Sequence, residues 1–549
     1  MTHQLHSADV LIVGAGPTGL TLANLLGQEG VNVILIDRKP STVGEPRAVS
    51  IDDESLRTMQ AAGLADEVLK DVVPGYGVHY YTRPGGRCFA KVEPTASEYG
   101  FPRRNAFRQP LFEASLRQGL KRFSNVHVRF GHNLVSFGNS HAGVKAQIEV
   151  EGGNPITVQA RYMVGCDGGR SPVREMLGIV LAGSTFKSRW LVLDTEDDDD
   201  PFWQTRVYCD ARRPVVDVPG PHHTRRFEFM IHPDENGDDA MQPETMAELL
   251  RPFRGDRPTN IIRKVVYTFH ARMAERWRVQ SVFLAGDAAH LTPPYAGQGM
   301  NSGVRDAHNL GWKLAAAIRG RITDAALDSY EMERRGHAWA LIRLALNLGE
   351  VMAPRSRFHA WLAHTFFSLT RYVRPVNDYF LQMRFKPKPR YDAGLLGPVD
   401  TLGKFSLRGR MFPQPRVACS GLEDTPLDDV IGNRFAIICY APDSIDALMA
   451  PTHPLWDALD MARIVIHQKD SPHFNLKDHP SWIQVSDKNG LLKNYLAAHH
   501  GKMILVRPDR YVAGVFDRAD ESHFADDLAR SMGITLAAKP MSAGSRAAA

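Results

Sequence analysis

Cysteine is scarce in this chain, with five residues among 549, and no two of them form a C-x-x-C pair. An odd number of widely separated cysteines excludes a disulfide framework, a zinc site and a dithiol redox centre. We therefore expect no metal ion and a protein that works in a reducing compartment, the cytoplasm.

Long apolar runs are also absent. Nowhere do about 18 apolar residues follow one another, and the N-terminus has no basic region followed by an apolar segment and a small-residue cleavage site. Basic residues exceed acidic ones by only 66 to 61, and the basic residues cluster only in pairs. Such a dilute charge predicts no nucleic-acid partner, and the missing apolar runs predict no membrane partner.

The composition is otherwise that of an ordinary globular protein. It is 43% hydrophobic and 9% aromatic, with 45 Gly and 35 Pro. At roughly 100 to 200 residues per domain, this length predicts two to four domains.

The first chemical signal lies near the N-terminus. Two short apolar runs, Asp9–Val13 and Val31–Ile36, flank the helix-forming segment Leu20–Gly27. This order predicts two parallel strands joined by a crossover helix. The glycine-rich segment Gly14–Gly19 joins the first strand to the helix, with the pattern G-x-G-x-x-G.

That position gives each glycine a function. Gly14 allows the tight turn, Gly16 lets a pyrophosphate approach the backbone, and Gly19 lets helix and strand pack closely. The free amides of the helix N-terminus would hold the phosphates, and Asp37 would bind the ribose hydroxyls. This motif predicts dinucleotide binding but does not separate NAD from FAD. The candidate cofactor-binding residues here are Gly14, Ala15, Gly16, Pro17, Gly19, Asp37 and Arg38.

A second block favours FAD. The apolar segment Ser281–Ala285 ends in Gly286-Asp287, and the glycine-rich loop Pro293–Gly303 leads into a helix from Val304. The loop amides and the helix terminus suit the electron-rich edge of a flavin, and Asp287 suits its ribityl chain. A plain NAD dehydrogenase needs no such second site. The candidates from this block are Asp287, Gly297, Gln298, Gly299, Met300 and Asn301.

A third block, Tyr162–Arg174, is again a strand leading into a turn, with Asp167 and two glycines. Alone it could be a loop with a helix N-cap. Together with the other two blocks it completes the pattern of an FAD-binding protein.

With these three motifs the sequence resembles the single-component FAD-dependent aromatic hydroxylases, from about residue 8 to about residue 515. The nearer likeness is to hydroxylases of 3-(3-hydroxyphenyl)propionate. It rests on the segments Pro46–Ala48, Ile51–Glu54, Gly86–Ala90, Pro102–Phe107, Arg225–Met230, Gly299–Gly303, Met383–Pro387 and Val506–Arg510.

The resemblance implies an α/β fold with a Rossmann-like FAD-binding domain of the glutathione-reductase type, an inserted antiparallel β substrate domain and a C-terminal thioredoxin-like domain without a redox role. Strand-like segments between residues 181 and 270, separated by Pro, Asp and Gly, predict the inserted sheet independently. The expected divisions are residues 1–180 and 271–395 for the FAD-binding domain with its helices, 181–270 for the substrate domain and 396–549 for the last domain.

The resemblance also implies an activity. The expected reaction hydroxylates a phenolic acid beside its hydroxyl group, turning 3-(3-hydroxyphenyl)propionate or 3-hydroxycinnamate into the 2,3-dihydroxy product with O2 and NADH or NADPH. Another phenol of the resorcinol or polycyclic type, and a flavoprotein without hydroxylase activity, stay open as alternatives. In this family Arg47 and Gln109 would line the FAD cleft, and Asp167 would support the cleft of the nicotinamide and the flavin.

Residues that bind the aromatic substrate are harder to identify, because polar and aromatic residues on the strands of a sheet more often serve packing. No catalytic residue is assigned. The candidates for contact with a phenol or a carboxylate are Tyr208, Arg226, His232, Pro294 and Tyr295. A homodimer is compatible with the sequence, and the expected partners are a small aromatic substrate and O2.

Overall fold

The computed structural model describes residues 4–42, 44, 47–419, 421–442, 452–469, 471, 474–476 and 480–535. Pro46, the first residue of one matching segment, lies outside this part of the chain, as do the last residues, 536–549. The chain forms two compact units, one made of the residues up to 315 with 330–389 and the other of 316–329 with those from 390 on. Each unit is described by itself.

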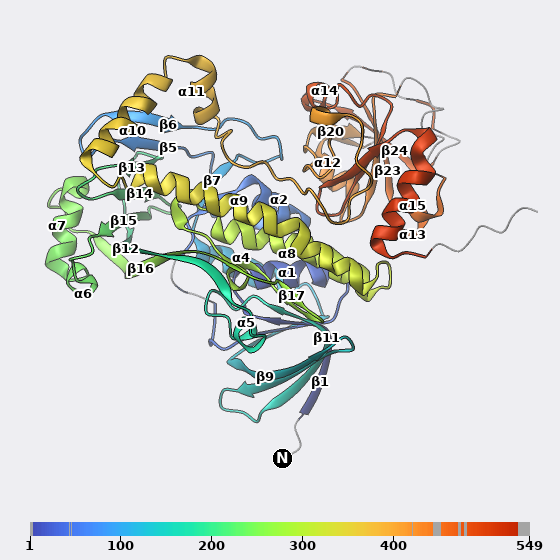
Figure 1. The fold of residues 1–549 in the computed structure, drawn as a ribbon, viewed down its shortest axis with the longest axis horizontal. Coiled ribbons are helices and arrows are strands. Elements are labelled where there is room, and N and C mark those ends of the chain that lie inside the picture. The colour runs from blue at the N-terminus through green and yellow to red at the C-terminus, as the bar shows by residue number, and fades with distance from the viewer. Residues whose placement is uncertain are drawn as a thin grey trace, which may run out of the picture. The chain divides into compact units, whose positions relative to one another are not determined.

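The first sheet of the first unit carries the N-terminal motif (Figure 1). Its central strands are β1 and β11, which pair in parallel, and β2 and β8 extend the parallel order on one side. Strand β2 and the second half of β1, Val10–Val13, are almost wholly apolar and buried, as expected where a sheet is covered on both faces. The strands along the sheet are β17 (Arg278–Val279), β18 (Val282–Leu284), β11 (Ile156–Gly165), β1 (Gln4–Val13), β2 (Val33–Asp37) and β8 (Val126–Phe130), with β9 (His132–Ser140) and β10 (Gly143–Val150) joined to β11.

The second sheet contains the predicted inserted strands. Its pairs are antiparallel except for β13 with β5, which is parallel. Two strands from earlier in the chain, β5 and β6, complete one edge. In order the strands are β19 (His290–Leu291), β16 (Asn260–Ala274), β12 (Leu181–Glu196), β15 (Arg225–Ile231), β14 (Val215–Pro219), β13 (Thr205–Tyr208), β5 (Val78–Tyr81) and β6 (Cys88–Val92).

The two faces of this second sheet have separate cores. One face holds Leu191, Phe227 and Phe229, and packs with residues of α7 (Pro243–Arg254) such as Met246. The other face holds Trp190, Val216 and Val218, among others, and packs with Tyr295, Met352 and Met383 from outside the sheet. We call this second face the inner face. Because successive side chains of a strand point to opposite sides, a residue's position in the strand decides which core it joins.

The remaining elements of the first unit surround these sheets. A small sheet joins β3 (Ser50–Asp52), β7 (Arg104–Phe107) and β4 (Val72–Pro74). The helices are α1 (Pro17–Gln28), α2 (Asp53–Ala61), α3 (Ala65–Leu69), α4 (Gln109–Leu120), α5 (Pro172–Met176), α6 (Gly237–Ala240), α8 (Gly299–Ile318), α9 (Ser329–Met352), α10 (Arg357–Thr370) and α11 (Arg374–Leu381), with short 3-10 turns η1 (Gly286–Ala288) and η2 (Pro294–Ala296).

The second unit is an α/β domain with one mixed sheet. Its middle strands β22, β23 and β24 run parallel, and β25 and β26 continue antiparallel at one edge. The strands in order are β21 (Leu422–Pro426), β20 (Arg416–Cys419), β24 (Trp482–Asp487), β23 (Ala462–His467), β22 (Ala436–Tyr440), β25 (Met503–Val506) and β26 (Val512–Phe516). The helices and turns are η3 (Asp324–Asp328), η4 (Gly403–Phe405), α12 (Leu427–Ile431), α13 (Pro454–Ala458), α14 (Leu491–Tyr495), η6 (Arg518–Asp520) and α15 (Glu521–Met532).

The predicted fold class, an α/β chain with an inserted β-sheet and a separate C-terminal α/β domain, is confirmed. Among the described residues, no helix combines the length and the apolar character needed to cross a bilayer.

Candidate functional site

The glycine-rich loop between β1 and α1 has the geometry that its sequence predicts. Gly14 has a φ of +109°, and its N–H donates to the Ile36 carbonyl at 2.8 Å. Gly16 precedes α1, no side chain caps the helix there, and a Cβ on Gly16 would meet no atom within 4 Å. The N-terminus of α1 therefore faces open space, as an anion-binding helix end requires.

Asp37 closes this loop from the neighbouring strand. Its Oδ2 accepts a hydrogen bond from the Ala15 N–H at 2.8 Å, and its Oδ1 accepts one from the Lys39 N–H at 2.9 Å. Arg38 is exposed, and Pro17 occupies the first position of α1, where a missing N–H is no loss. The carboxylate is thus held beside the glycine loop with further lone pairs available for a ribose.

Asp287 lies in the turn η1. Its side chain is exposed, yet the surrounding protein raises its pKa, an effect that the nearby charges of His290 and Arg47 oppose. A carboxylate that is both accessible and closely surrounded is typical of a cleft. Arg47, itself exposed, therefore belongs to the same neighbourhood as Asp287.

Buried hydrogen bonds hold the loop before α8 in place. Gly297 has a φ of +62°, and α8 begins at Gly299 with space beside it. The Asn301 side chain is completely buried, and its Nδ2 donates to the carbonyls of Ser50 at 3.0 Å and Gly297 at 2.7 Å. Gln298 is buried as well, while Met300 is partly exposed. Asn301 therefore acts by holding the loop, and its side chain is engaged by the protein.

Asp167 has an unsatisfied oxygen. Its Oδ2 accepts a hydrogen bond from the Val173 N–H at 3.0 Å, but its buried Oδ1 has no partner among the described residues. Burial raises the pKa of this carboxyl group. A buried polar atom without a partner is costly, so its presence indicates a ligand. The open end of α1, the accessible Asp287 and this oxygen together fit FAD.

Gln109 has a supporting position. Its Oε1 accepts a hydrogen bond from the Ala48 N–H at 2.7 Å, and its Nε2 donates to Glu113 Oε1 at 2.7 Å. The side chain is 5% exposed. Gln109 therefore fixes the backbone next to Arg47.

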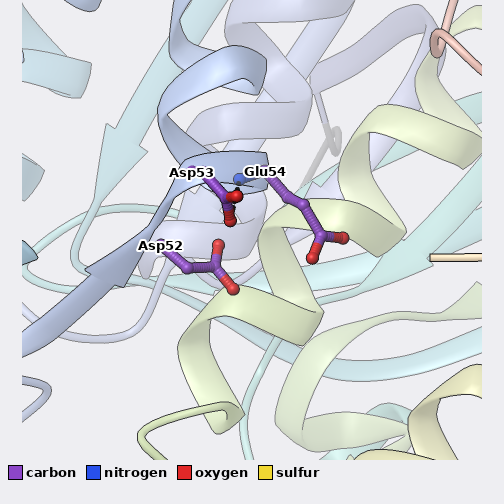
Figure 2. A group of neighbouring side chains, drawn as sticks. All are labelled: Asp52, Asp53 and Glu54. Atoms are coloured by element: carbon purple, nitrogen blue, oxygen red, sulfur yellow. Dashed lines mark hydrogen bonds between the residues drawn. The ribbon is translucent and has the colours of Figure 1, made fainter. Parts of the chain in front are cut away.

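A buried cluster of charges lies behind the α8 loop, and sequence reasoning gave it no function. Figure 2 shows its three carboxylates, Asp52, Asp53 and Glu54, at the junction of β3 and α2. Arg305 donates to Asp52 and, at 2.6 Å, to Glu54. Lys386 Nζ donates to Asp52 at 3.0 Å and to Glu54 at 2.9 Å. The cluster thus links α2, α8 and the segment after α11.

The cluster contains three acids and two bases, so its charges do not balance if every group is ionised. Burial raises the pKa of Asp53 to about 7, with Lys386 opposing and Asp52 and Glu54 reinforcing the shift. Burial would also raise the pKa of Glu54, but the charges of Arg305 and Lys386 outweigh it and lower that pKa. Asp53 is therefore the carboxyl group that takes up a proton near neutral pH.

A second buried network positions Asp287 and was also missed from the sequence. Asp306 on α8 accepts hydrogen bonds from the Gly286 N–H at 3.0 Å and from Arg334 Nε at 2.9 Å, and its Oδ2 lies 2.7 Å from His290 Nε2. Burial alone would raise the pKa of Asp306, but His290 and Arg334 lower it to about 2. A permanent negative charge therefore ties the Gly286-Asp287 turn to α8.

Of the substrate candidates, Tyr295 joins the inner face of the second sheet. Its ring packs edge-on against Trp190 at 5.9 Å and Phe269 at 5.6 Å, and Phe186 lies at 6.4 Å. A Cβ on Gly349 would stand 2.8 Å from this ring, so α9 makes room for it. Burial raises the pKa of Tyr295 to about 12, which keeps its hydroxyl protonated. Tyr295 thus brings the loop before α8 into contact with a buried aromatic cluster.

The other substrate candidates are placed differently. Tyr208 lies in the opposite core, against Phe253. Arg226 points to the inner face, but its guanidinium donates to both carboxylate oxygens of Asp194, at 2.7 and 3.1 Å. His232 follows the end of β15, and Pro294 is exposed beside Tyr295. The five candidates therefore do not form one group.

Two family models match the chain. Residues 7–345 match the FAD binding domain, and residues 409–531 match the HcaD C-terminal domain. The glycine loop, Asp167 and Asp287 all fall within the first match. The fold and this site thus define an FAD-binding flavoprotein.

Curated relatives are similar over nearly the whole chain. One from Escherichia coli, named 3-(3-hydroxy-phenyl)propionate/3-hydroxycinnamic acid hydroxylase, is 41% identical over 92% of this chain and 92% of its own. One of the same name from Mycolicibacterium smegmatis is 41% identical over 96% of this chain and 93% of its own. The solved structure of the flavin-dependent monooxygenase PieE in complex with FAD and substrate has a TM-score of 0.78 at 22% identity, covering 96% of this chain and 99% of that one.

The chain belongs to the family of FAD-dependent aromatic hydroxylases and is an oxidoreductase. The family membership and the FAD cofactor expected from the three motifs are confirmed.

Proposed function

We propose that the protein hydroxylates 3-(3-hydroxyphenyl)propionate and 3-hydroxycinnamate beside their phenolic hydroxyl, giving the 2,3-dihydroxy acids. The 41% identity to hydroxylases with these substrates in their names supports the proposal. The structural observation that carries it is the aromatic cluster of Trp190, Phe269 and Tyr295, because Tyr295 belongs to the same loop as the FAD candidates Gly297–Asn301. An aromatic ring bound beside this cluster would lie next to the proposed cofactor site.

The reaction balances with NADH and O2. NADH gives up a hydride and the solvent a proton. One oxygen atom of O2 is inserted into a ring C–H bond to give the new hydroxyl group, and the other leaves as water with the hydride-derived hydrogen and the proton. Bound FAD would pass the electrons to O2 and so supply the oxygen that is transferred. This chain's residues would hold the flavin, orient the phenol and exclude water.

We also propose how the cofactor is held. The amides at the start of α1 would bind the pyrophosphate, Asp37 the ribose and Asp287 the ribityl chain, with the start of α8 at the flavin edge. Asp167 and Arg47 would line the FAD cleft. Gln109 and Asn301 would hold the backbone segments that form it. The proposed domain division follows the one that the sequence predicts, with the inserted sheet as the substrate domain.

The test is oxidation of NADH by the purified protein with and without 3-(3-hydroxyphenyl)propionate, with O2 consumption and mass spectrometry of the product. We expect the phenol to stimulate NADH oxidation and a product heavier by one oxygen atom. Parallel runs with NADPH settle the electron donor, for which we propose NADH. Stimulation by no phenol at all would contradict the hydroxylase assignment and favour a flavoprotein without this activity.

We propose further that the protein is a homodimer and that α10 and α11 form the interface. Large apolar side chains are exposed along these helices and the turn between them: Phe358, Trp361, Leu362, Phe366, Leu369, Tyr372, Val373, Val376 and Tyr379. At 150–250 Å² for a whole aromatic side chain, the five exposed rings alone offer roughly 600 Å². A typical interface buries about 800 Å² on each partner, so this surface is of the right size for a second copy of the chain.

Light scattering after gel filtration tests the dimer. We expect twice the chain mass of 61.1 kDa for the wild type and the single mass for Trp361→Glu with Phe366→Glu. A wild-type monomer would contradict the proposal, and binding to lipid vesicles instead would identify this face as a membrane contact. We propose a cytoplasmic location, which the five free cysteines support, and cell fractionation tests it.

A further inference from the structure

The inner face of the second sheet carries one carboxylate that the site described so far does not use. Along β15, Phe227, Phe229 and Ile231 join the opposite core. Glu228 alternates with them and therefore points to the inner face, as does Met230, which packs there. Glu228 pairs in register with Val192 of β12 and Val216 of β14, so its neighbours across both strands are apolar.

Asp194 on this face binds two arginines, Arg226 and Arg263. Asp194 binds the guanidinium of Arg226 through both oxygens and also accepts a hydrogen bond from Arg263 Nη1 at 3.2 Å. Arg226 Nη1 donates to the Arg47 carbonyl at 2.5 Å, and Arg263 Nη2 donates to the Tyr267 hydroxyl at 3.0 Å. Neither arginine is thus placed to bind a substrate carboxylate.

Glu228 differs from this network. Its Oε1 lies 3.8 Å from Arg226 Nη1, which is beyond hydrogen-bond distance. Its side chain is 14% exposed, so it is not fully enclosed by the protein. A largely buried carboxylate normally accepts several hydrogen bonds, so this group has capacity for a donor that the protein itself does not provide.

The surroundings of Glu228 connect it to the cofactor loop. The charge of Glu228 acts on the Tyr295 hydroxyl, whose ring covers the inner face. Burial raises the pKa of Glu228, and the charged groups facing it are Arg226 on its own strand, Asp194 on β12 and Arg263 on β16. Arg226 and Arg263 oppose the shift and Asp194 reinforces it.

We propose that Glu228 accepts a hydrogen bond from the phenolic hydroxyl of the substrate and thereby selects hydroxylated rings and sets their orientation. This inference rests on the proposed function and assigns a residue to it. The substrate's own carboxylate would be repelled by Glu228, so the acid chain points away from this residue and the phenol end points toward it. A phenol that donates to a carboxylate gains electron density in its ring, which favours oxygen transfer to the adjacent carbon.

The test compares two ligands that differ only in the hydroxyl group, 3-(3-hydroxyphenyl)propionate and 3-phenylpropionate. Binding of each to the FAD-loaded protein is measured by calorimetry, without NADH, so that no turnover occurs. A hydrogen bond to a charged acceptor should make the wild type prefer the hydroxylated acid by roughly 10-fold or more. In Glu228→Ala we expect the ratio of the two affinities to fall toward one, and in Glu228→Gln to an intermediate value. The affinity for 3-phenylpropionate should change little in either variant.

The control is Glu350→Gln, which removes an exposed carboxylate that also acts on Tyr295 and pairs with Arg355 at the surface. It should keep the wild-type preference. A mutant in which both ligands weaken equally, or in which the preference stays at the wild-type value, would overturn the inference. Such a result alongside wild-type hydroxylation would leave the proposed function intact, whereas failure of the wild type to bind or hydroxylate any phenol would remove the proposed function instead.

Discussion

Gly19 lies so close to Gly14 that a Cβ on Gly19 would stand 2.0 Å from the Gly14 carbonyl oxygen. Gly16, three residues before it, has nothing within 4 Å of the same position. The two glycines of one motif are therefore required for different reasons. Gly19 serves the packing of α1 on β1, whereas Gly16 keeps open the space in which we place the cofactor.

This contrast predicts different effects for two alanine substitutions. Gly19→Ala should destabilise the apoprotein by several kcal/mol, because backbone would have to move. Gly16→Ala should leave the apoprotein's thermal unfolding nearly unchanged and weaken FAD binding at least tenfold. Calorimetry of the apoprotein and titration with FAD measure both effects. Equal loss of stability in the two variants would contradict the distinction.

The network around Asp306 makes a second prediction. Asp306→Asn replaces one acceptor oxygen by a donor facing Arg334 or the Gly286 N–H, and it leaves a buried arginine without its counter-charge. Breaking a buried ion pair in this way costs about 3–5 kcal/mol. We expect a lower unfolding temperature and loss of FAD on gel filtration, since the Asp287 turn is released from α8.

The matched control for this prediction is Asp66→Asn, an exposed residue on α3. This variant should retain bound FAD and unfold at the wild-type temperature. An Asp306→Asn protein that retains FAD with wild-type affinity would show that the turn is held by other contacts.

The cofactor loops could be predicted from sequence because each is local. Gly14–Gly19 and Gly286-Asp287 contain the turn, the strand end and the helix start within a few residues, so spacing alone implies the chemistry. The charged networks could not be predicted in this way. Asp52 meets Arg305 and Lys386 across more than 250 residues, and only the fold brings them together.

The substrate side was harder for a different reason. A strand residue changes faces when its position shifts by one, so choosing Tyr208 from its type could not reveal that it joins the opposite core. Arg226 does lie on the inner face, but its guanidinium is bound by Asp194. Asp194 lies on another strand, so the sequence did not show this pairing. Glu228, two residues further on, was part of the matching segment Arg225–Met230 but was not singled out.

Substitutions of Tyr208 and Tyr295 test which face of the second sheet binds the substrate. Tyr208→Leu should lower the unfolding temperature, because the ring packs in the core against Phe253, and should leave the affinity for 3-(3-hydroxyphenyl)propionate unchanged. Tyr295→Leu should weaken that affinity roughly 2- to 10-fold, the equivalent of an aromatic contact of about 0.5–1.5 kcal/mol. Calorimetric unfolding and ligand binding separate the two outcomes. A clear loss of affinity in Tyr208→Leu would place the substrate on the other face.

Asp53 predicts a pH dependence of stability. Its pKa in the folded protein is about 7, whereas an aspartate in the unfolded chain titrates near 3.9. Between these values the folded state binds more protons than the unfolded state, so this group's contribution to stability is greatest below about pH 4 and falls as the pH rises toward 7. Above that pH both states are ionised and the loss levels off. Over the range between the two pKa values, stability falls by about 1.4 kcal/mol for each rise of one in pH.

Asp53→Asn removes this titration while keeping an oxygen that can accept from the Glu54 N–H, and it leaves two acids facing two bases in the cluster. The free energy of unfolding of the variant minus that of the wild type should therefore rise between pH 5 and pH 7 and stay constant above pH 7.5 or so, with the variant the more stable protein at alkaline pH. Urea unfolding at a series of pH values measures the difference. A difference that does not change with pH would mean that Asp53 stays ionised in the folded protein and that its charge is balanced by Lys386.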